Sequence, residues 1–140
     1  MRAAPITERK VVGMSDKLYG VLIHPDTTIE LVETPGGAEE IHRLVGGYFE
    51  NVYLPDVPVS DIVMSVDEEG KLKGKPVNIL ATVMYRNLYD FIVGDALILK
   101  LVRVGEYNEL DQVPFSYENV NVIMQILHMY KRRWLLEEGL

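Results

Sequence analysis

The most hydrophobic segment of the chain runs from Phe91 to Val102 and limits the folds that the rest of the sequence can adopt. A strand with one face in water alternates apolar and polar residues, whereas this segment is apolar at nearly every position. The segment is therefore too continuously apolar for a half-exposed strand. The sequence therefore predicts a sheet with residues 91–102 as its central strand.

Other segments have the patterns of strands around that centre. Residues 18–24 and 28–32 are rich in β-forming residues on either side of a turn, which predicts a hairpin. Residues 48–54 and 61–66 alternate in hydrophobicity, which predicts two further strands. After the next turn, residues 71–73 are expected to return as a short strand.

Helical patterns occupy three other segments. Residues 38–45 are predicted to form a short amphipathic helix that Gly46 and Gly47 end, because glycine accepts a left-handed backbone. A helix of about two turns is expected over 79–86, and a long one over 116–138 after a polar loop from 105 to 114. The predicted class is α+β: a mostly antiparallel sheet of five or six strands, with two short helices and the long C-terminal helix packed on one face.

Length and composition indicate one domain. The 140 residues are 48% hydrophobic and 25% charged, which is typical of a globular chain with its own core. We expect residues 1–17 to be a flexible arm and residues 18–140 to form a single domain, with a core at 18–102 and a C-terminal helix at 116–138. No stretch has the pattern of a signal peptide or a membrane span, so we expect a cytoplasmic protein with no membrane partner.

Charge and cysteine content exclude several kinds of function. The net charge of −7 opposes binding to phosphate backbones, so a nucleic-acid partner is not expected. The chain has no cysteine, which excludes disulfides, thiolate nucleophiles and iron–sulfur clusters. His24, His42 and His128 do not have the spacing of metal ligands. We predict no metal, no cofactor and no catalytic residues.

The long helix carries two apolar stripes on opposite sides. One is predicted to pack on the sheet and consists of Val120, Ile123, Met124, Leu127, Tyr130 and Trp134. The other, here called the outer stripe, requires a different partner, which the N-terminal arm, another part of the domain or another subunit could supply. The partners expected for the whole protein are a second copy of the chain or a host protein. The predicted interface residues of the outer stripe are Val122, Ile126, Met129, Arg133 and Leu136.

A second group of residues has the chemistry of a small-ligand site. Lysine can neutralise a phosphate, and asparagine can hydrogen-bond to a polar edge, so a small anionic ligand could bind near residues 71–78. An acid at the mouth of a central strand can line a pocket, although Asp90 could instead cap a turn and Gly94 with Asp95 could form a bulge. The predicted ligand-binding residues are Lys71, Lys73, Lys75, Asn78, Tyr89, Asp90 and Asp95.

Three motifs in the middle of the chain resemble a known family. They are Leu-Val-Gly-Gly-Tyr at 44–48, Asp-Glu-Glu-Gly-Lys-Leu-Lys-Gly-Lys-Pro-Val-Asn at 67–78 and Tyr-Asp-Phe-Ile-Val-Gly-Asp at 89–95. Together they resemble, over residues 18–102, a family of small uncharacterised domains common in bacteriophages and bacterial mobile elements. The resemblance implies no activity.

Three functions are compatible with these patterns. The first is a non-enzymatic phage or mobile-element accessory protein that binds a protein or itself through the outer stripe. The second is a protein that binds or sequesters a nucleotide-derived ligand. The third is an enzyme of unknown reaction, for which Asp90, Asp95 and His42 would be the first residues to mutate.

Overall fold

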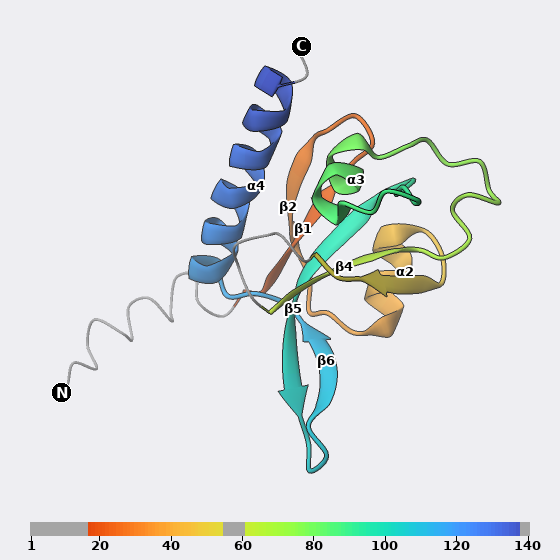
Figure 1. The fold of residues 1–140 in the computed structure, drawn as a ribbon. Coiled ribbons are helices and arrows are strands. Elements are labelled where there is room, and N and C mark those ends of the chain that lie inside the picture. Colours follow the sequence, from red (N-terminus) through yellow and green to blue (C-terminus); the bar gives the residue numbers. More distant parts are fainter. Residues whose placement is uncertain (1–16, 55–60, 138–140) are drawn as a thin grey trace.

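The computed structural model of the chain describes residues 17–54 and 61–137, and within these ranges it contains one six-stranded antiparallel sheet and three helices (Figure 1). The α+β class is as predicted. The predicted arm lies outside the described residues, except for Lys17. The strands are β1 (Tyr19–Ile23), β2 (Ile29–Glu33), β3 (Phe49–Val52), β4 (Ile62–Asp67), β5 (Ala96–Val104) and β6 (Glu109–Val113). The helices are α2 (Ala38–Val45), α3 (Ile79–Tyr85) and α4 (Tyr117–Glu137).

Strand β5 is the centre of the sheet, as the apolar segment predicts. The strand order is β2-β1-β5-β4-β3, and β6 also pairs with β5. Strand β1 pairs with β5 at residues 96–98, and β6 pairs with it at residues 100–104. The strand begins at Ala96, however, and not at Phe91. Gly94 has a φ of 72° and donates its N–H to the Pro76 carbonyl, which turns the preceding residues away from the sheet.

Two local predictions are wrong. The polar loop predicted over residues 105–114 contains β6. Apolar and polar residues alternate only weakly along this strand, because the β5–β6 hairpin extends away from the body and covers little core (Figure 1). Residues 71–73 do not return as a strand. They lie in successive turns, in which Lys73 and Lys75 donate their backbone N–H groups to the carbonyls of Glu69 and Gly70.

The helices cover both faces of the sheet, which corrects the prediction of one covered face. Leu97 and Leu99 of β5 pack with Ile41 and Val45 of α2. The alternate β5 residues, including Ile98, belong to the larger core cluster under α3 and α4. The physical reason is that β5 is apolar on both sides, so each side must be shielded from water.

Helix α4 uses one of its two apolar stripes in the core. Val120, Ile123 and Leu127 are buried against β1, β2 and α3. Burial of each such side chain stabilises the fold by about 1.5–3 kcal/mol. No helix in the described ranges is both long and apolar enough to cross a membrane.

Candidate functional site

The seven predicted ligand-binding residues lie at one end of the sheet. Strands β4 and β5 are antiparallel, so the segment that follows β4 and the segment that precedes β5 meet there. The end of β1 is adjacent because Ile23 pairs with Ala96. Glycines 46 and 47 reach the same end, since β3 begins opposite Asp67.

Asp67 is the best-shielded charge at this end. Only 1% of its side chain is exposed, and its Oδ2 atom lies 2.7 Å from the Nζ atoms of both Lys73 and Lys75. Lys73 also donates to the Gly46 carbonyl at 3.1 Å, and Lys75 donates to the Val45 carbonyl at 3.0 Å. These carbonyls end α2 and have no partner within the helix. The Asp67 cluster (Asp67, Lys73 and Lys75) therefore joins the loop after β4 to the end of α2.

The protonation state of Asp67 follows from its contacts. Burial would raise the pKa of the carboxyl, but hydrogen bonds from Lys73, Lys75 and the Glu69 backbone N–H outweigh it and lower the pKa to about 2. Asp67 is therefore anionic at neutral pH. Its charge and the carbonyls of α2 offset the positive charge of both lysines, which reduces what they offer to an external anion.

Lys71 makes a separate set of contacts. It forms an ion pair with Asp90, and its Nζ atom lies 4.4 Å from the centre of the Phe91 ring. Asp90 also accepts the backbone N–H of the next residue, Phe91, at 2.8 Å. The hydrogen bond from Lys71 lowers the pKa of Asp90. This pair fastens the loop before β5 to the loop after β4.

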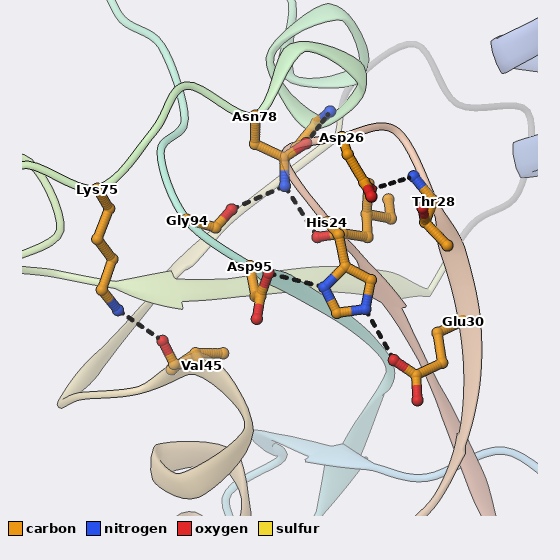
Figure 2. A network of polar contacts seen from close by, with 11 residues as sticks. His24, Asp26, Thr28, Glu30, Val45, Lys75, Asn78, Gly94 and Asp95 are labelled. Atoms are coloured by element: carbon orange, nitrogen blue, oxygen red, sulfur yellow. Dashed lines mark hydrogen bonds and ion pairs between the residues drawn. The ribbon is translucent and has the colours of Figure 1, made fainter.

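Asn78 is buried at the centre of this end (Figure 2). Its Oδ1 atom accepts the Ala81 backbone N–H at 3.1 Å and caps α3. Its Nδ2 atom donates to the carbonyls of Ile23 and Gly94, each at 2.8 Å. One amide thus joins β1, the turn before β5 and the start of α3. These structural contacts explain why an asparagine ends the motif at residues 67–78.

His24 lies between two carboxylates (Figure 2). Its Nδ1 atom is 2.8 Å from Asp95, and its Nε2 atom is 2.7 Å from Glu30. Burial lowers the pKa of the imidazole, but the hydrogen bonds to Glu30 and Asp95 together raise it above the ordinary 6.5. Sequence reasoning placed His24 only at the end of a strand. Its partner Asp95 is 71 residues away, so no local pattern indicates the contact.

Apolar side chains are exposed on the same loops. Tyr89 is 95% exposed, and Leu88 and Leu72 are similarly exposed. The backbone N–H of Tyr89 is held by Asn87 at 2.8 Å, so the exposed ring stands on a hydrogen-bonded turn. Because the Tyr89 ring is almost wholly exposed to solvent, it does not pack against the Asp67 cluster.

The three residues named for an enzyme do not form one set. The His42 ring contacts Tyr48, with the ring centres 4.8 Å apart. Asp90 pairs with Lys71, and Asp95 pairs with His24. Among the residues that the structure describes, no cluster of three or more histidine, aspartate and glutamate side chains could hold a metal ion.

The outer stripe of α4 lies mostly on the side of the helix away from the core, except for Ile126, which is partly buried and packs against the core. Val122, Met129 and Leu136 are 53%, 61% and 78% exposed. A groove of about 350 Å³ follows the second half of the stripe. It is lined by Ile126, Met129, Tyr130, Arg132, Arg133 and Leu136.

Taken together, the fold is an α+β domain in which an antiparallel sheet is covered on both faces and one end is closed by charged and amide side chains. The chain belongs to the family described as domain of unknown function DUF3846, whose model matches residues 18–119. The match begins where the resemblance does and continues past residue 102 through β6 into the first turn of α4. No curated protein and no solved structure gave a match.

Proposed function

We propose that this protein is a non-enzymatic accessory protein of a bacteriophage or mobile element that acts by association, with a second copy of the chain bound along the outer stripe of α4. The observation that carries the proposal is the exposure of Val122, Met129 and Leu136 on one line of the helix. Three large apolar side chains in a row leave more apolar surface in water than isolated surface residues do.

The spacing of the outer stripe favours another helix as the partner. Its five positions, 122, 126, 129, 133 and 136, are separated alternately by four residues and three. This is the a/d spacing of a helix that packs lengthwise against a second helix. An identical stripe satisfies this geometry through a two-fold axis, the commonest symmetry of soluble oligomers.

Light scattering on the full chain during size-exclusion chromatography tests the proposal. We expect a mass of twice 15.9 kDa for the wild type and the single-chain mass for Met129→Glu, because a carboxylate in the apolar stripe is costly to desolvate. His128→Glu is the matched control, since His128 is exposed on the same helix but outside the stripe. A wild type that is monomeric at all concentrations, or a Met129→Glu protein that remains dimeric, would contradict the proposal.

Small-ligand binding is the second candidate function. The lysine loop offers it little support, because Lys71, Lys73 and Lys75 each pair with a carboxylate of the chain. A different surface, on the α2 face of the sheet, has the open polar atoms that a ligand site needs.

A further inference from the structure

Helix α2 covers only part of its sheet face. Its buried residues Ile41 and Val45 pack over Leu97 and Leu99, whereas Leu101, two residues further along β5, is only partly buried. A groove of about 280 Å³, here called the α2 groove, lies over this uncovered part between the start of α2, β3 and β6. The β5–β6 hairpin, which supplies the β6 side of the groove, extends beyond the body of the domain (Figure 1).

A buried serine fixes two amide side chains beside the groove. Ser65 is 0% exposed, and its hydroxyl donates to Asn51 Oδ1 at 2.8 Å. The same hydroxyl oxygen accepts a hydrogen bond from Gln112 Nε2 at 3.3 Å. Because these contacts use the side-chain oxygen of Asn51 and the side-chain nitrogen of Gln112, they set the orientation of both amides.

Each amide therefore keeps one open hydrogen-bonding end. The Asn51 Nδ2 group remains a donor and the Gln112 Oε1 atom remains an acceptor, and neither has a partner among the described residues. Both residues line the α2 groove. The groove thus offers a donor and an acceptor held in place before any ligand arrives, which lowers the entropic cost of binding.

The remaining lining favours a flat, uncharged ring. Phe49 and Tyr53 contribute aromatic surface, and Leu101 and Leu110 contribute aliphatic surface. Asp111 is the one charged residue among the lining residues, and neither lysine nor arginine is among them. Such a site repels a phosphate but suits an aromatic ring with polar edges, for which stacking and amide hydrogen bonds are the usual means of recognition. The volume is close to the lower end for small-molecule sites, which fits one ring system better than an extended peptide.

We propose that the α2 groove binds the base of an uncharged nucleoside, with Asn51 and Gln112 hydrogen-bonding to its polar edge and Phe49 and Tyr53 packing against its ring. The site is separate from the outer stripe of α4 and does not depend on self-association.

Chemical-shift titration of the full ¹⁵N-labelled chain tests this site. The probes are adenosine, cytidine, uridine, their 5′-monophosphates and N-acetylphenylalanine methylamide, each added to about 5 mM so that a Kd near 1 mM is detectable. We expect a nucleoside to shift the side-chain amide signals of Asn51 and Gln112. The monophosphates should bind no more tightly, because the groove has no cation to receive the phosphate.

Two variants and one control complete the experiment. Gln112→Leu should weaken nucleoside binding about tenfold, the loss expected for one hydrogen bond of about 1.4 kcal/mol. Leu110→Lys, on an exposed rim position, tests the apolar wall if Gln112→Leu does not fold. Gln125→Leu, on the exposed side of α4, should bind like the wild type.

Four results would overturn the proposal. They are no shift with any probe, tighter binding of the monophosphates with shifts at residues 71–75, binding of the methylamide as tight as that of the nucleosides, and unchanged binding in the folded groove variants. The second result would restore the lysine loop as the ligand site, and the third would identify the groove as a peptide site.

Discussion

Replacement of Asp67 by asparagine removes the charge on which the Asp67 cluster depends. Each pKa unit corresponds to about 1.4 kcal/mol, so lowering the pKa of Asp67 from 3.8 to about 2 corresponds to about 2.5 kcal/mol of stability at neutral pH. Lys73 is 41% exposed, and water screens part of its interaction. We therefore expect Asp67→Asn to lower the free energy of unfolding by about 2 kcal/mol at pH 7.

The pH dependence of this loss has a defined sign. The pKa of Asp67 is lowered in the folded state, so its contribution is present above the unfolded-state pKa near 3.8 and is lost as the pH falls through about 2. The difference in unfolding free energy between wild type and Asp67→Asn should be constant from pH 7 to about 5. Below that it should shrink, and it should nearly vanish close to pH 2.

Urea unfolding followed by circular dichroism at a series of pH values measures this difference. Glu68→Gln is the matched control, because Glu68 is the exposed neighbour of Asp67 and its loss should change stability by no more than about 0.5 kcal/mol. A loss below about 0.5 kcal/mol for Asp67→Asn at pH 7, or a loss that persists unchanged to pH 2, would refute the reasoning.

Three other substitutions test the contacts around this end. Because the pKa of His24 is raised by its two carboxylates, its stabilising contribution is fully present below pH 6.5 and is lost as the pH rises through the folded-state pKa. Wild type should therefore lose stability relative to His24→Gln on going from pH 6 to higher pH, and an NMR titration that places this pKa at or below 6.5 would contradict the assignment. Asn78→Ala should lower the free energy of unfolding by about 3 kcal/mol, because it removes the cap of α3 and the side-chain donor to two buried carbonyls. In the same urea assay, the control Asn119→Ala, at an exposed position, should lower it by about 0.5 kcal/mol or less. Gly47→Ala should destabilise the fold by about 1–3 kcal/mol in thermal melts, because the alanine Cβ would lie 2.6 Å from the Asp67 Oδ1 atom. A melt like that of wild type would show that the carboxylate can move aside.

Hydrophobic pattern predicted the sheet well where burial is strong. The continuous run around Leu97 and Ile98 indicated the central strand because no other position in a sheet shields both faces. The prediction nevertheless placed all helices on one face, whereas α2 covers the other face of the same run. Strand β6 was missed because it pairs with β5 in a hairpin that extends from the body of the domain. Backbone hydrogen bonds hold such a hairpin with little burial, so the side chains of β6 show no strong alternation of apolar and polar residues.

The site was harder to predict than the fold, for a geometric reason. The lysines at 71, 73 and 75 alternate in sequence, which on a strand would place them on one face. In the turns that the chain forms, Lys71 instead reaches Asp90, while Lys73 and Lys75 reach Asp67. Which carboxylate each lysine meets depends on contacts between segments far apart in the chain, and one sequence does not contain that information.

The residues of the family motifs mainly hold the end of the sheet together. Asp67, Lys73, Lys75 and Asn78 each use their polar atoms within the chain, where they join α2, α3 and the loops around β5. The family match ends at residue 119, so all five residues of the outer stripe of α4 lie beyond it. The proposed self-association would therefore use a part of the chain outside the family match, whereas the α2 groove, built from residues 37–112, lies inside it. Members of the family with a different C-terminal segment should therefore differ in oligomeric state before they differ in the groove.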